Sequence, residues 1–136
     1  MDLVRDRVDP EKAKSGSKFN LDDDTWVKVR RWNNPEYRTR ILELREEWIT
    51  QNQHPEDEVL PDDVTRDIME KAMSECVLVD WGGFFKDGEP LPYSVKAAYD
   101  FLSDEGFEEE MMRIINASNT RARFMTERSK AKVKKS

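Results

Sequence analysis

The chain has 136 residues, of which 38% are charged and only 37% hydrophobic, and its formal net charge is −6. This length and balance predict one domain with a modest core and a large solvated surface. No stretch has the ~20 apolar residues of a membrane-spanning helix, and the N-terminus lacks the apolar segment of a secretory signal. The single cysteine, Cys76, excludes an internal disulfide and is expected to be a reduced, buried thiol.

The charge is unevenly distributed along the chain. Residues 113–136 contain eight Arg or Lys and one acidic residue, so this segment carries +7 and the preceding residues carry −13. An acidic body is poorly suited to general nucleic-acid binding, because the nucleic-acid backbone is itself negatively charged. The basic segment alone could still contact phosphates, other proteins or the body of the chain.

The first elements in chain order are an arm and a strand. Residues 1–24 hold few apolar side chains, which predicts a flexible polar arm with Phe19 and Leu21 as candidate docking points. In residues 25–32, TWVKVRRW, Val27 and Val29 lie on one face of an alternating pattern rich in strand-forming residues. We therefore expect a short strand there.

Two amphipathic helices are predicted next. Asn34 can cap a helix that begins at Pro35 and runs to about Thr50, because proline is well tolerated at the first helical position. Its apolar residues recur at helical spacing on one stripe: Tyr37, Ile41, Leu44 and Trp48. A polar connection follows, and a second helix begins near Asp62 or Asp63 with its own stripe: Val64, Ile68, Ala72 and Cys76.

The segment VLVDWGGFFKDGEPLPYS, residues 77–94, reads as a continuous apolar run followed by a turn at Asp87–Gly88. A short hairpin at this turn is one interpretation, with Pro90 and Pro92 limiting its length. Ser94 can cap a third helix, and a fourth begins near Gly106 with acidic residues in its first turn, as the helix dipole favours. The apolar stripe of this fourth helix contains Phe107, Met111, Ile114 and Ser118.

The predicted fold class is therefore mainly α. We expect a compact bundle of about four helices with a short N-terminal strand, a small hairpin and disordered termini. The predicted organisation is a flexible arm over residues 1–24, a single mainly helical domain over residues 25–125, and a basic disordered tail over residues 126–136.

The chain shows no pattern typical of catalysis or of cofactor binding. The only histidine, His54, lies in the polar connection, whereas Cys76 lies on an apolar stripe, so a Cys–His nucleophile pair is a weak hypothesis beside that of a buried thiol. The acidic runs at residues 22–24 and 56–58 lack the ligand spacing of a calcium-binding loop. We expect no enzyme activity, no cofactor and no metal.

Aromatic residues concentrate in one region. Six of the thirteen aromatics lie between Trp81 and Phe101. Core packing accounts for most of them, but adjacent side chains of an extended segment point to opposite faces, so Phe84 and Phe85 cannot both enter one core. One of the pair is expected to be exposed or to face a partner. The hypothesis of a partner-binding surface names these residues: Phe84, Phe85, Trp81, Tyr93, Met111 and Met112.

Three segments carry a resemblance to a known family. The segments WVKVRRWNNPEY, ECVLVDWGGFFKDGEPLPYSVKAAYDFLSD and MMRIINAS, in this order, resemble the tail assembly chaperones of long-tailed bacteriophages over roughly residues 25–118. Within them, the apolar run ending in Asp80–Trp81, the turn Asp87–Glu89 and the helix start Pro92–Ser94 match the family pattern. The double glycine, Gly82–Gly83, and the Phe pair do not map onto that pattern.

The resemblance implies a function without catalysis. Such chaperones bind and solubilise the long, helical tape measure protein and help tail tube protein to polymerise around it. They act in the cytoplasm of the infected host and are absent from the mature virion. Formation of a homo-oligomer stays open. Two alternatives remain: another phage structural protein, such as a head–tail connector or minor tail protein, and a regulator that contacts nucleic acid through its basic tail.

Overall fold

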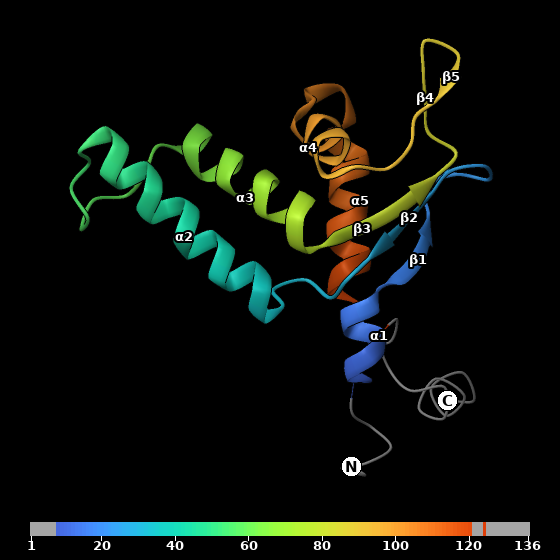
Figure 1. Cartoon of the computed structure of the whole chain (residues 1–136), viewed down its shortest axis with the longest axis horizontal. Coiled ribbons are helices and arrows are strands. Elements are labelled where there is room, and N and C mark those ends of the chain that lie inside the picture. Colours follow the sequence, from blue (N-terminus) through green and yellow to red (C-terminus); the bar gives the residue numbers. More distant parts are fainter. Residues whose placement is uncertain (1–7, 121–123, 125–136) are drawn as a thin grey trace.

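A computed structural model describes residues 8–120 and residue 124 of the chain (Figure 1). Helices account for 56% and strands for 16% of the structure. The helices are α1 (Pro10–Ser15), α2 (Pro35–Asn52), α3 (Asp62–Cys76), α4 (Val95–Ser103) and α5 (Glu108–Asn119), with a 3₁₀ turn at Glu105–Phe107. The strands are β1 (Ser17–Asn20), β2 (Trp26–Val29), β3 (Leu78–Gly82), β4 (Phe85–Lys86) and β5 (Glu89–Pro90).

An antiparallel sheet of three strands in the order β1-β2-β3 forms the centre of the fold. In its register, Val27 of the middle strand lies between Phe19 of β1 and Trp81 of β3. Val27 and Val29 are fully buried, and α5 packs on β2. The predicted strand and its buried face are therefore confirmed, although the strand is four residues long rather than eight.

The prediction of a mainly α bundle is wrong. The molecule is a mixed α/β protein with two small antiparallel sheets. β3 was missed since its apolar run continues directly from α3, where a run of this kind does not distinguish strand from helix. The prediction of a flexible arm is also wrong for residues 8–24. There, Asp9 caps α1 through hydrogen bonds from the N–H groups of Glu11 and Lys12, and β1 pairs along the whole of β2.

Helices α2 and α3 lie side by side and extend away from the sheet (Figure 1). Local signals explain both ends of α2: Asn34 accepts a hydrogen bond from the N–H of Tyr37, Pro35 takes the first position, and Gln53 adopts the left-handed conformation after the last turn. The predicted helix and the start of α3 at Asp62 are confirmed.

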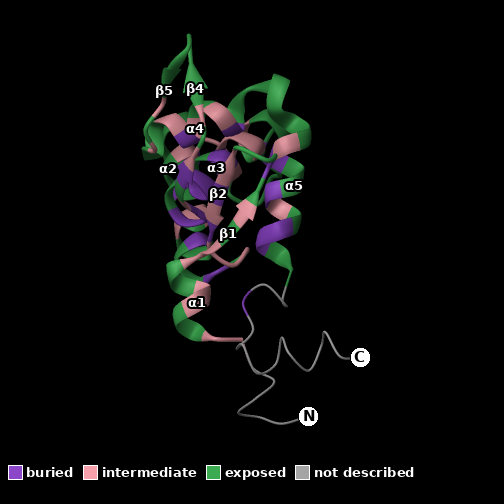
Figure 2. Cartoon of the chain, turned by 90° about the vertical axis from the view of Figure 1, so that its right-hand side faces the viewer, coloured by how far each residue is buried: buried purple, intermediate pink, exposed green. Residues whose placement is uncertain are grey.

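The remaining predicted elements are also present. Ser94 caps α4 by accepting a hydrogen bond from the N–H of Ala97. The β4–β5 hairpin turns at Asp87 and Gly88, which both have positive φ angles, as a two-residue turn of this kind requires. It is only two residue pairs long, and both of its strands are exposed (Figure 2).

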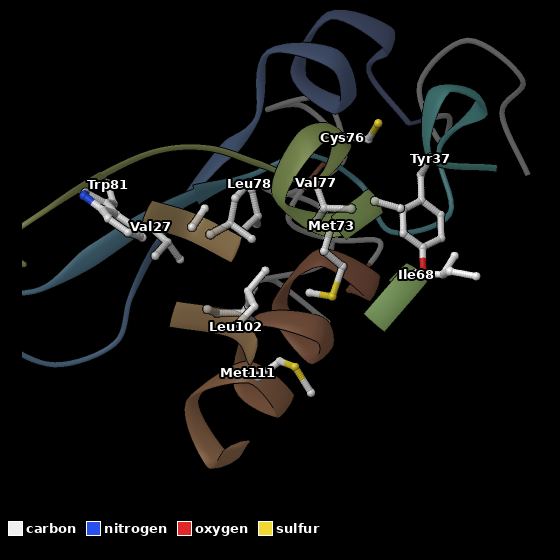
Figure 3. Close-up of a cluster of buried hydrophobic side chains, with 14 of the residues drawn as sticks. Val27, Tyr37, Ile68, Met73, Cys76, Val77, Leu78, Trp81, Leu102 and Met111 are labelled. Carbon is white, nitrogen blue, oxygen red and sulfur yellow. The ribbon is translucent and has the colours of Figure 1, made fainter. Parts of the chain in front are cut away.

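The core lies where the sheet meets α3, α4 and α5 (Figure 3). Its fully buried side chains come from every part of the chain: Val27, Met73, Leu78, Leu102, Ile114 and Phe124. Phe124 lies near the N-terminal segment, because its carbonyl accepts a hydrogen bond of 2.8 Å from the N–H of Asp9. The predictions for residues 1–7 and for the basic tail at residues 126–136 fall outside the described residues.

Candidate protein-binding groove

A groove of about 670 Å³ lies where the end of β3, the β4–β5 hairpin, α4 and the start of α5 come together. We call it the aromatic groove, because five of the seven large apolar residues that line it are aromatic: Leu21, Trp81, Phe84, Phe85, Leu91, Phe101 and Phe107. Aromatic surface that stays accessible in this way is typical of sites that bind other proteins.

The aromatic rings of the groove support one another. Phe84 stacks on Trp81 with ring centroids 4.0 Å apart and an interplanar angle of 12°. Phe101 meets Phe84 edge-on at 5.2 Å, and Phe107 lies 4.9 Å from Phe101. The floor is therefore a preformed, connected cluster, and such contacts contribute about 1 kcal/mol per pair beyond the burial of area.

Hydrogen bonds fix the inner wall. The indole N–H of Trp81 donates to the carbonyl of Leu91 at 3.0 Å, and only 5% of Trp81 is exposed. Tyr93 donates its hydroxyl to the carbonyl of Leu78 at 2.9 Å, and burial raises the pKa of Tyr93 to about 12. Both residues were predicted to bind a partner, and the structure places them where they support the groove from within.

Phe84 and Phe85 differ in exposure, as the alternation of side chains along an extended segment predicts. Phe84 packs against the core, whereas 65% of Phe85 is exposed on the hairpin. The expectation that one of the two is exposed is confirmed. Phe107 presents a second accessible ring of the groove from the turn before α5, where it is 42% exposed.

The two methionines of the hypothesis do not line the groove. Met111 is buried in the core at 3% exposure, and Met112 is 48% exposed on α5 outside the groove. Sequence reasoning missed Phe101 and Phe107 as groove residues. Phe107 was placed on the buried stripe of the fourth helix, but α5 begins at Glu108, one residue after Phe107.

The rim of the groove is mainly acidic. Four carboxylates surround it: Asp22, Asp100, Asp104 and Glu110. Two cations, Lys86 and Arg113, share the rim. Arg113 donates to the carbonyl of Leu21 at 2.8 Å and lies over the ring of Phe19, so its guanidinium has partners within the fold. A hydrogen bond from the N–H of Asp24 lowers the pKa of Asp22, which favours its charged form.

The residues weighed for catalysis lie elsewhere. Cys76 is buried at the end of α3, and burial raises the pKa of its thiol. The His54 ring lies 5.3 Å from the ring of Trp48, beside the connection after α2. Within the described part of the chain, no three His, Cys, Asp or Glu side chains are grouped to hold a metal ion. None of the described helices has the length and apolar character needed to cross a membrane.

A comparison with protein families gives a match. The model of the family described as YdaY prophage protein matches residues 32–135, which is more than half of the chain and includes α2 to α5. No curated protein and no solved structure matched. The chain therefore belongs to the YdaY prophage protein family, and it is a protein of phage origin.

Proposed function

We propose that this phage protein is a tail assembly chaperone that binds and solubilises the tape measure protein and promotes assembly of tail tube protein around it. In this role it acts by protein–protein binding without catalysis, in the cytoplasm of the infected host, and it stays out of the mature virion. Membership of a prophage family and the resemblance of residues 25–118 to tail assembly chaperones support the proposal. The observation that carries it is the aromatic groove.

The groove suits a helical client. An amphipathic helix that lays its apolar stripe into a groove is a common mode of peptide recognition. Phe85 of the hairpin and Phe107 before α5 both offer accessible rings, and the stacked Trp81 and Phe84 form a floor that needs little ordering upon binding. A long helix whose apolar stripe would otherwise cause aggregation is covered in this arrangement.

The experiment is co-expression of this chain with the tape measure protein of the same phage, scored by the soluble fraction of the tape measure protein. We expect solubilisation by the wild type and its loss with Phe85→Ser, because removal of an interface aromatic anchor commonly weakens binding about tenfold or more. Phe85 is chosen over Phe84, since Phe84 packs against Trp81 and its loss would also disturb the fold.

Val95→Ser is the matched control. Val95 is an exposed apolar residue, at 48% exposure, and does not line the groove. The control variant is expected to solubilise the client as the wild type does. Equal loss with both variants, or no solubilisation by the wild type, contradicts the proposal. Detection of the chain in purified virions contradicts it as well and favours a connector or minor tail protein.

A further inference from the structure

A second apolar groove, of about 700 Å³, lies between α2 and α3. We call it the aliphatic groove, after the apolar side chains that line it: Ile41, Leu42, Val59, Leu60, Ile68 and Met69. The described residues that line it are all different from those of the aromatic groove. Leu42 is 66% exposed and Val59 is 90% exposed, so two large aliphatic side chains of the groove lining are largely exposed to solvent. Exposed apolar surface of this kind indicates an interaction site.

The charges along the aliphatic groove differ between its two ends. At one end, Arg38 reaches toward the start of α2, where it donates to the carbonyl of Asn33 at 2.8 Å. At the other end, Arg45 donates to the carbonyl of Glu56 at 3.3 Å, which places the acidic run at residues 56–58 beside it. All three residues of this run are exposed acids. One end is therefore basic, and the other has a net negative charge.

We propose that the aliphatic groove is where a second copy of this chain binds, in a two-fold symmetric dimer. A two-fold contact joins the same patch on both copies, so the patch must be complementary to itself. An antiparallel arrangement of two grooves places the Arg38 end of each copy against the acidic run of the other, with Leu42 and Val59 covered between them. Among the described residues, Arg38 forms no ion pair within its own chain, so its guanidinium is available to a carboxylate of the second copy.

The dimer leaves the aromatic groove open. The helices α2 and α3 extend away from the sheet at the left of Figure 1, whereas the β4–β5 hairpin lies at the upper right, far from them. Two linked copies therefore present two aromatic grooves at once. A long client with repeated apolar stretches would bind such a dimer more tightly than one copy, because the second contact becomes intramolecular. The dimer itself does not depend on the proposed function.

The test compares two charge-reversal variants by sedimentation velocity. The first variant is Arg38→Glu, and the second is Glu56→Lys/Glu58→Lys. The wild type is expected to be a dimer, and each variant alone a monomer, because each then places like charges against each other in a symmetric contact. An equimolar mixture of the two variants is expected to form a dimer again, since both ends are then complementary.

Circular dichroism checks that each charge-reversal variant is folded. If one of them does not fold, Leu42→Ser tests the same contact by removing an apolar side chain from it. We expect Leu42→Ser to raise the dimer dissociation constant at least about tenfold and Val95→Ser to leave it unchanged. A wild type that stays monomeric at about 100 µM overturns the proposal, because a dimer with a micromolar dissociation constant would be almost fully formed at that concentration. A dimer that survives all the variants overturns it too. If the two folded, monomeric variants stay monomeric when mixed, Arg38 does not face the acidic run of a second copy, and the proposed two-fold contact is overturned.

Discussion

At the scale of single residues, Gly82 and Gly83 let the end of β3 pass close to the β1–β2 turn. A Cβ atom on Gly82 would lie 2.4 Å from the indole nitrogen of Trp26. A Cβ atom on Gly83 would lie 1.9 Å from the carbonyl oxygen of Asp24, and Gly83 also has a φ of +79°. Thr25 donates its hydroxyl to the carbonyl of Gly83 at 3.2 Å. The double glycine therefore shapes one wall of the aromatic groove.

Gly83→Ala is expected to reduce the free energy of unfolding by about 3 kcal/mol, because it combines left-handed strain with a clash against backbone. Gly88→Ala is the matched control. Gly88 has a similar φ of +81°, but an added Cβ there meets nothing within 4 Å, so strain alone applies and the expected loss is about 1 kcal/mol. Urea unfolding measures both, and equal losses would show that the approach to Asp24 is not what requires Gly83.

The residue scale also shows what the sequence could predict of the site. The split between Phe84 and Phe85 follows from strand alternation alone, and the structure confirms it. Met111, unlike Met112, lay on the predicted stripe of the fourth helix, yet both methionines were assigned to the partner-binding surface; the structure buries Met111 and exposes Met112. Phe107 was assigned to the core because the exact start of α5 decides its exposure, and helix ends are the least certain part of any such prediction.

At the scale of elements, Asn34 joins the start of α2 to the end of α3. Its side-chain oxygen accepts from the N–H of Tyr37 at 2.9 Å, while its amide nitrogen donates to the carbonyls of Arg31 and Cys76, each at 2.9 Å. Asn34 is 8% exposed, so these groups have little access to water. The cap was predictable from the sequence, whereas the bond to Cys76, 42 positions away, was not.

Asn34→Ala is expected to reduce the free energy of unfolding by about 3 kcal/mol, because it removes the cap and leaves the buried Cys76 carbonyl without its donor. Asn34→Ser restores an acceptor for the cap but no amide donor, so it should recover only about 1 kcal/mol. Thermal and urea unfolding measure the two variants. Full recovery with serine would show that the link to α3 contributes nothing.

A second link between elements is made by Arg66, which also contacts a buried acid on its own helix. Arg66 of α3 donates to Glu70 at 3.1 Å and to Glu108 of α5 at 3.0 Å. Only 4% of Glu70 is exposed, and burial raises its pKa above the ordinary value of 4.5, against the opposing effect of Arg66. A raised pKa means that the folded state binds the proton more tightly than the unfolded state does.

The free energy of unfolding is therefore expected to fall as pH rises from 4.5 through the raised pKa of Glu70, because the unfolded state ionises first. Glu70→Gln removes this titration, so the stability of the wild type relative to Glu70→Gln should decrease between pH 4.5 and neutrality. Glu109→Gln, at an exposed position of α5, is the control. Urea unfolding of the wild type and the variants across this pH range measures the effect. If the stability of the wild type relative to Glu70→Gln stays constant or increases with pH, the raised pKa of Glu70 is contradicted.

At the scale of the whole molecule, helices were predictable and the central sheet was not. Caps and apolar stripes specify α2, α3 and α4 within a few residues, because these signals act over one or two turns. β1 and β3 depend on partners that are distant in sequence: β3 pairs with β2 across about fifty residues of α2 and α3. β1 contains a single large apolar side chain, Phe19, and nothing local distinguishes it from a flexible segment.

The aromatic groove, like the sheet, depends in part on contacts between segments that are distant in sequence. Residues 81–91 supply its floor and one wall, and the sequence predicted this part from the density of aromatics. The other walls come from the β1–β2 turn, α4 and the start of α5, which only the fold brings together. The acidic rim arises in the same way, since its carboxylates lie as far apart in sequence as Asp22 and Glu110.

The central claim is that the aromatic groove binds a helical phage client. The most direct measurement places a photo-crosslinking amino acid at Phe85 and, as a control, at Val95, in cells that also produce the tape measure protein. The account predicts a strong crosslink to the tape measure protein from Phe85 and little from Val95. Equal crosslinking from both positions, or none from Phe85 while the client remains soluble, would contradict it.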